Sequence, residues 1–224
     1  MTPRQLAFDL AHAESYGRAG FFVSPANATA LATLEDWAQW PGGKLVLAGP
    51  RGAGKTHLAH IWAEAAGATR IAAVALDAAA LRDLGPRVVV EDADAAAGLP
   101  ACEEALFHLH NLILPAGRLL VTAASPPRDW GLALPDLLSR MQAAPLARLE
   151  APDDALLSAV LVKLFSDRQI AVPPNLIPYL VLRMERSIAA ARALVAVLDA
   201  RALAEGRAVT RALAAEVLDS PEPE

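Results

Sequence analysis

The chain has 224 residues, 54% of them hydrophobic, and a formal net charge of −5. The apolar content excludes wholesale disorder, and the acidic balance argues against a large nucleic-acid-binding face, which needs a basic surface. A single cysteine, Cys102, excludes a disulfide framework and a cysteine-based metal site, and charges or prolines interrupt every apolar run well short of a membrane span. We therefore expect a soluble, cytoplasmic protein with either one medium domain or a domain plus a small additional part.

The N-terminal region divides into two stretches. Residues 1–20 have no clear hydrophobic periodicity, which predicts a mobile arm. The globular part is expected to begin at Phe21, and apolar residues at helical spacing predict a helix over residues 27–40. Pro41-Gly42-Gly43 ends this helix because glycine and proline disfavour its continuation.

The next stretch holds the most specific motif of the chain. Residues 49–56 have the pattern G-x-x-x-x-G-K-T, between an apolar run at 44–48 and a helical pattern from His57 onward. Strand, glycine loop and helix form the context of a phosphate-binding loop, in which backbone N–H groups surround phosphate oxygens. Lys55 is expected to reach the β- and γ-phosphates and Thr56 to hold Mg²⁺, whereas the alternative is a glycine turn that merely precedes a helix. The predicted nucleotide-binding residues of this segment are Gly49, Pro50, Arg51, Gly52, Ala53, Gly54, Lys55, Thr56 and His57.

Further apolar runs predict the rest of a sheet. Strands are expected at 71–76, 87–90, 118–123 and 146–149. Helical patterns at 99–114 and 134–141 lie between them, and strands that alternate with helices predict a parallel sheet covered on both faces.

Two of these strands end in polar residues. Glu91 and Asp92 follow the run at 87–90, where acidic residues of a phosphate-loop protein hold Mg²⁺ and position water. The alternative is an ordinary strand end with solvated acids. Thr122 and Ser125, near the end of the strand at 118–123, are candidates to face a γ-phosphate, or to satisfy backbone groups.

The character of the chain changes after Pro152, since no strand pattern remains. Helices are predicted at 153–169, 175–184, 187–204 and 210–218, with Asp153 and Thr210 as N-caps. The expected organisation is a nucleotide-binding α/β domain over 21–150, a helical lid over 151–218 and a polar tail over 219–224.

Several of these segments together resemble the DnaA family of AAA+ proteins. They are the phosphate loop with His57-Leu58, the acidic strand end, the run Leu134-Pro135-Asp136-Leu137-Leu138-Ser139-Arg140, and Gly206-Arg207-Ala208-Val209-Thr210 before the last helix. The resemblance implies an AAA+ P-loop NTPase with a five-stranded parallel sheet, flanked by helices and followed by a small all-helical lid. It also implies ADP or ATP with Mg²⁺ as cofactors, with Mg²⁺ held by Thr56, Glu91 and Asp92. The segment that contains Phe22, Val23 and Asn27 would then lie against the adenine.

The N-terminal arm adds a more specific resemblance. Gln5, Leu6, Phe8 and Leu10 stand in a pattern similar to the sliding-clamp-binding motif of Hda-type regulators, which are DnaA-related proteins without the DNA-binding domain. This implies two partners, the DNA polymerase III sliding clamp (β subunit) and the initiator DnaA, with little or no direct DNA binding and no membrane. A homo-oligomer is left open. Arg140 would serve as an arginine finger in trans, whereas the pattern alone favours a solvated arginine on an amphipathic helix.

Three positions depart from the initiator pattern. Glu91 stands where aspartate is usual, Ala124 replaces a polar sensor residue, and Ala189 replaces the sensor arginine of the lid. Arg186 and Arg192 lie three residues to either side of Ala189 and are candidates to substitute for it. These departures imply weak intrinsic ATPase activity, in a protein that acts mainly by stimulating hydrolysis in a partner. The alternatives are a DnaA-like DNA-binding or helicase-loading ATPase, and a small-molecule phosphotransferase.

Overall fold

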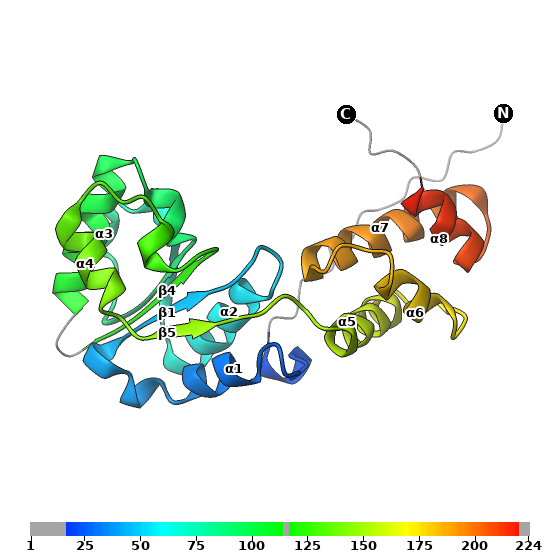
Figure 1. The fold of residues 1–224 in the computed structure, drawn as a ribbon, viewed down its shortest axis with the longest axis horizontal. Coiled ribbons are helices and arrows are strands. Elements are labelled where there is room, and N and C mark those ends of the chain that lie inside the picture. The colour runs from blue at the N-terminus through cyan, green and yellow to red at the C-terminus, as the bar shows by residue number, and fades with distance from the viewer. Residues whose placement is uncertain (1–16, 114–116, 220–224) are drawn as a thin grey trace.

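The computed structural model describes residues 17–113 and 117–219. A sheet with helices on both faces forms one part and four helices form the other, joined after the last strand (Figure 1). Residues 1–16 of the predicted arm and residues 220–224 of the predicted tail therefore lie outside the described residues. Within the described ranges, no helix is long and apolar enough to cross a membrane.

The sheet has five parallel strands in the order β2-β3-β4-β1-β5. β4 therefore lies between the acidic strand β3 and β1, the strand before the phosphate loop. The fold class is confirmed. The strands are β1 (Lys44–Ala48), β2 (Thr69–Ala72), β3 (Arg87–Glu91), β4 (Arg118–Ala123) and β5 (Leu146–Arg148).

Two hydrophobic cores cover the two faces of the sheet. Side chains alternate between faces along a strand, so Val88 and Val90 of β3 join one core and Val89 joins the other. The helices α3 (Pro100–Ile113) and α4 (Pro135–Gln142) pack on the first core, and α1 (Ala28–Glu35) and α2 (Lys55–Ala66) on the second. This alternation also decides where the residues at the strand ends point.

Two predicted elements differ from the structure. The second strand is expected at 71–76, but β2 ends at Ala72, and a 3-10 turn follows at Ala73–Ala75. That turn buries Ala73 and Leu76 in the core and leaves Val74 exposed. The first helix ends at Glu35 rather than continuing to residue 40, and Trp40 stacks on Trp62 with ring centroids 5.1 Å apart.

The remaining helices pack on one another around a third core, and we call them the lid. Their N-caps are as predicted, because Asp153 accepts a hydrogen bond of 2.7 Å from the N–H of Leu156 and Thr210 accepts one of 3.3 Å from that of Leu213. The lid helices are α5 (Asp154–Asp167), α6 (Leu176–Val181), α7 (Ile188–Glu205) and α8 (Arg211–Leu218).

Candidate nucleotide-binding site

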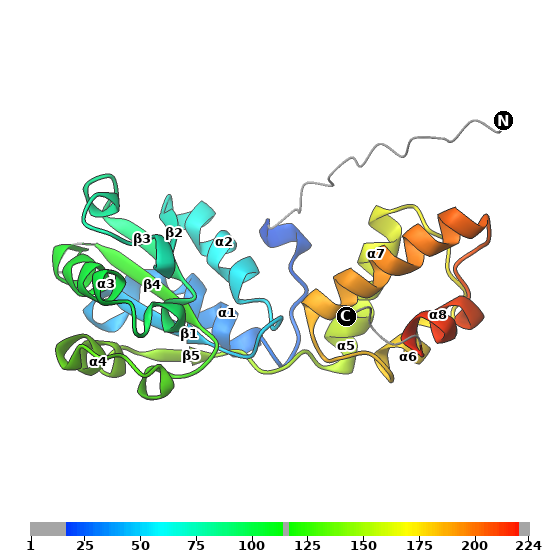
Figure 2. The ribbon, with the colours of Figure 1, turned by 90° about the horizontal axis from the view of Figure 1, so that it is seen from above.

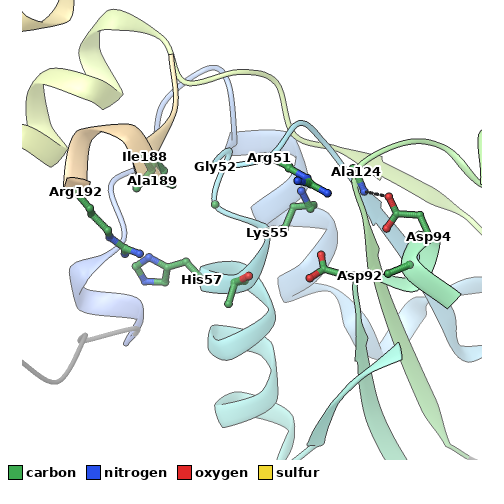
Figure 3. Close-up of a pocket in the computed structure, with 13 residues that line it drawn as sticks. Arg51, Gly52, Lys55, His57, Asp92, Asp94, Ala124, Ile188, Ala189 and Arg192 are labelled. Carbon is green, nitrogen blue, oxygen red and sulfur yellow. Dashed lines mark hydrogen bonds between the residues drawn. The ribbon is translucent and has the colours of Figure 1, made fainter. Parts of the chain in front are cut away.

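The predicted phosphate loop joins β1 to α2, at the carboxyl end of the sheet (Figure 3). Gly52 and Gly54 have φ angles of +73° and +104°, which favour glycine. A Cβ added at Gly49 would lie 2.7 Å from the carbonyl oxygen of Leu149. The backbone therefore requires glycine at these positions and leaves a concave surface lined by main-chain groups.

Lys55 is buried in this loop. Its Nζ donates hydrogen bonds of 2.7 Å to the carbonyl oxygen of Gly49 and 3.0 Å to that of Pro50. Burial lowers the pKa of this lysine, while the carboxylates of Asp92 and Asp94 oppose that shift. The ammonium group thus sits between loop carbonyls and two acids, in reach of an anion that enters the loop.

A cavity of about 540 Å³ opens in front of the loop, between the sheet and the lid. Its size lies within the range of small-molecule and cofactor sites, roughly 300–1,000 Å³. Its wall comes from the phosphate loop, the segments after β3 and β4, and the start of α7. The lining residues are Arg51, Gly52, Gly54, Lys55, Thr56, His57, Asp92, Asp94, Ala95, Ala124, Ile188, Ala189 and Arg192.

The acidic wall of the cavity differs from the expected one. Asp92 and Asp94 line it, whereas Glu91 does not. Glu91 points to the same face of β3 as Val89, because side chains alternate, and its carboxylate forms a 2.8 Å hydrogen bond with Nε of Arg70 on β2. The sequence pattern of a strand that ends in acids indicates Glu91 and Asp92, whereas Asp94 lies in the turn that follows and is identified by the structure.

The end of β4 holds both aspartates in place. The buried hydroxyl of Thr122 accepts a 3.1 Å hydrogen bond from the backbone N–H of Asp92, whose φ of +52° is uncommon for a non-glycine residue. The backbone N–H of Ala124 donates a 3.1 Å hydrogen bond to the carboxylate of Asp94, shown dashed in Figure 3. Thr122 therefore positions an acid and does not line the cavity, and Ser125 is not a lining residue either.

The lid closes the cavity through the start of α7. The backbone N–H of Ile188 donates a 2.8 Å hydrogen bond to the carbonyl oxygen of Gly52. Arg192, one turn further along α7, points toward His57 (Figure 3). Arg186 lies elsewhere, with a 2.7 Å ion pair to Asp154 at the start of α5. Of the two candidate arginines, Arg192 is the one that lines the cavity.

The segment before α1 contacts a residue of the cavity wall through Phe21, and not through the residues expected from the sequence. Phe22 and Val23 are about half exposed, and the amide of buried Asn27 donates a 2.9 Å hydrogen bond to the carbonyl oxygen of Phe22. None of these three lines the cavity. Phe21 instead forms a T-shaped contact with His57, with ring centroids 5.1 Å apart.

Arg140 lies away from this cavity. It is in the last turn of α4, with its guanidinium 4.9 Å from the ring centroid of Phe107 on α3. The helices α3 and α4 form the end of the molecule opposite to the lid (Figures 1 and 2). The predicted clamp-binding residues Gln5, Leu6, Phe8 and Leu10 lie outside the described residues.

Comparisons with solved structures agree with this architecture, while no model of a known protein family matches the sequence. Domain III of the replication initiation protein DnaA from Thermotoga maritima superposes with a TM-score of 0.76 and 19% identity, over 93% of this chain and 98% of that one. The chain has the AAA+ fold. AMPPCP-bound DnaA from Aquifex aeolicus superposes with a TM-score of 0.66 and 16% identity, over 82% of this chain and 65% of that one. The Holliday junction branch migration motor RuvB from Thermotoga maritima superposes with a TM-score of 0.63 and 19% identity, over 79% of this chain and 61% of that one.

Proposed function

We propose that this protein binds ADP or ATP in the cavity between the phosphate loop and the lid. The glycine-lined backbone surface and the buried ammonium of Lys55 supply N–H donors and positive charge where phosphates bind. Arg192 and His57 line the same cavity and supply further positive or hydrogen-bonding groups. The AMPPCP in DnaA from Aquifex aeolicus, which has the same fold, supports an adenine nucleotide as the ligand.

The oxygen donors of the cavity also fit Mg²⁺. Thr56 offers a hydroxyl, and Asp92 and Asp94 offer carboxylates, which are the hard ligands that this ion prefers. When bound, Mg²⁺ neutralises phosphate charge. Because Glu91 is held by Arg70, the proposed acidic residues for Mg²⁺ are Asp92 and Asp94.

We further propose that the nucleotide-bound protein is a regulator that stimulates hydrolysis of ATP held by another protein. The observation that carries this proposal is the position of Arg140, which packs on Phe107 and acts on Lys44 at the start of β1, the end of that strand away from the protein's own phosphate loop. From there its guanidinium is available to a phosphate group on a neighbouring molecule. An arginine supplied in trans accelerates such hydrolysis by about 10³–10⁵-fold.

The proposed partners follow from the resemblance of the sequence to Hda-type regulators. The arm with Gln5, Leu6, Phe8 and Leu10 would bind the sliding clamp, and Arg140 would act on ATP held by DnaA. In this role the protein restrains replication initiation. A short peptide with apolar anchors and one amide is suited to an apolar pocket on a clamp.

The test is the rate of hydrolysis of DnaA-bound ATP in the presence of DNA-loaded clamp. Arg140→Ala is expected to abolish the stimulation and to leave clamp binding intact. Arg128→Ala is the matched control, because Arg128 is 72% exposed and lies outside α4. Unchanged stimulation by Arg140→Ala would remove this function. Salt-dependent DNA binding with DNA-stimulated turnover would favour a DNA-binding or helicase-loading ATPase instead.

A further inference from the structure

Arg140 is accompanied by a second cation, Lys44. The chain contains three lysines, Lys44, Lys55 and Lys163. Lys55 belongs to the phosphate loop, and Lys163 pairs with Asp167 at 2.9 Å on the lid surface. Lys44 is the first residue of β1, at the end of the sheet where Arg140 lies, and the charge of Arg140 acts on it. Its environment therefore differs from that of both other lysines.

The ammonium of Lys44 is held by a neutral base. It contacts Nε2 of His110, a buried residue near the end of α3. Burial, and then the charges of Lys44 and Arg140, lower the pKa of His110 to about 4, so its ring is uncharged at neutral pH. Nε2 thus accepts a hydrogen bond from the lysine and orients it without neutralising its charge.

The positive charge of this pair is not compensated by an acid. Within residues 17–113 and 117–219, neither Lys44 nor Arg140 forms an ion pair with a carboxylate. Burial and the charge of Arg140 lower the pKa of Lys44. Two partly exposed cations that repel one another disfavour the folded protein, and a multivalent anion beside both would relieve that repulsion.

We propose that Lys44 acts with Arg140 as a second cation that contacts the polyphosphate of a nucleotide held by a neighbouring protein. This inference rests on the proposed function, because it uses the same end of the molecule. The anion is not the protein's own nucleotide. Lys44 and the phosphate loop lie at opposite ends of β1, and four residue steps of a strand span about 13 Å.

Arg140 and Lys44 differ in the geometry with which each can contact a phosphate group. Arg140 presents a planar guanidinium, which its contact with Phe107 orients, and it suits two oxygens of one phosphate. Lys44 presents a compact charge on a flexible stem, and His110 fixes its direction. Loss of the Lys44 contact removes a hydrogen bond to a charged group and is therefore expected to reduce the stimulated rate by about 10-fold or more.

The test compares Lys44→Gln, Lys44→Met and Lys44→Arg in the full chain, with DNA-loaded clamp and DnaA carrying ATP. Gln and Met are expected to lower the stimulated rate by about 10-fold or more, and Arg is expected to restore most of it because it keeps the charge. Met retains an apolar stem of similar length and so tests loss of packing. Lys163→Gln is the matched control, since it removes a lysine from the lid surface.

A binding readout separates charge from folding. Wild type is expected to bind DnaA loaded with AMPPCP more tightly than DnaA loaded with ADP, and Lys44→Gln is expected to lose most of that preference. If Arg140→Ala abolishes stimulation while Lys44→Gln and Lys44→Met retain wild-type rates and preference, the Lys44 inference is overturned and the proposed function stands. If Arg140→Ala has no effect either, both are overturned.

Discussion

The carboxylate of Glu103 on α3 accepts a 2.8 Å hydrogen bond from the backbone N–H of Leu134, the residue that precedes α4. It also accepts bonds from the N–H groups of Ala133 at 3.1 Å and Gly98 at 3.0 Å, and its side chain is 2% exposed. One buried acid thus joins α3 to the start of the helix that carries Arg140. Arg140 lies in the last turn of the same helix.

Glu103→Gln is expected to weaken the junction, because an amide has one acceptor oxygen where the carboxylate has two. The expected loss is about 1–3 kcal/mol in the free energy of unfolding, measured by urea denaturation. Glu104→Gln is the matched control, since Glu104 is the exposed neighbour on the same helix. Equal stability of the two variants would show that the carboxylate is not needed.

The same carboxylate predicts a pH dependence. Burial raises the pKa of Glu103, but the three backbone N–H donors outweigh burial and hold it below the ordinary value of 4.5. A depressed pKa means that the carboxylate stabilises the fold above pH 4.5, and that this contribution is lost as the pH falls through the folded pKa. The stability difference between wild type and Glu103→Gln should therefore shrink in acid. A difference that stays constant from pH 7 to pH 3 would contradict this assignment.

A second prediction concerns the contact of the phosphate loop with the lid. A Cβ added at Gly52 would lie 1.9 Å from Oγ of Ser187, the N-cap of α7. Gly52→Ala is therefore expected to push α7 away from the loop, and to lower both stability and nucleotide affinity. The positive φ alone costs about 1–2 kcal/mol.

Gly131→Ala separates these two causes. Gly131 has a φ of +72°, almost the same as the +73° of Gly52, but a Cβ there would meet nothing within 4 Å. We expect Gly131→Ala to lose stability by the backbone cost alone and to keep its nucleotide affinity. Isothermal titration with ADP measures that affinity, and an equal loss in both variants would rule out the lid contact as the cause.

Much of the fold is predictable from local patterns. The apolar runs of β1, β3 and β4 mark buried parallel strands, and Asp153 and Thr210 mark the starts of α5 and α8. The edge strand β2 is less predictable, because it pairs with β3 alone and its apolar run continues into a 3-10 turn. β2 itself is largely exposed, and the two residues that the run at 71–76 buries, Ala73 and Leu76, lie in or just after the turn. The apolar pattern alone therefore does not separate the strand from the turn.

The candidate site is predictable where backbone conformation is encoded locally, as in the glycines of the phosphate loop. It is not predictable where three-dimensional neighbours decide. The sequence does not show that Arg70 holds Glu91, or that the backbone of Ala124 holds Asp94. The contact of Lys44 with His110 joins residues 66 positions apart, which no periodicity indicates.

The reassignment of the acids leads to a third prediction. Asp92→Asn and Asp94→Asn are expected to weaken Mg²⁺-dependent nucleotide binding by roughly 10-fold each, because each removes a carboxylate from the cavity. When EDTA removes the Mg²⁺, the same two substitutions should instead raise nucleotide affinity, because fewer negative charges then face the phosphates. Glu91→Gln should leave both affinities near wild type, since its partner is Arg70. Loss of Mg²⁺ dependence in Glu91→Gln alone would restore the assignment expected from the sequence.

The two lid arginines allow the last prediction. Arg192 lines the cavity, whereas Arg186 forms a 2.7 Å ion pair with Asp154 and donates a 3.2 Å hydrogen bond to the carbonyl oxygen of Pro152. Arg192→Ala is expected to lower nucleotide affinity by about 10-fold, the effect of one charged hydrogen bond. Arg186→Ala should leave nucleotide affinity unchanged, and should instead weaken the contacts with Pro152 and Asp154 in the segment that connects the sheet to the lid. Isothermal titration with ADP and ATP checks both variants, and an affinity loss in Arg186→Ala with none in Arg192→Ala would reverse the two roles.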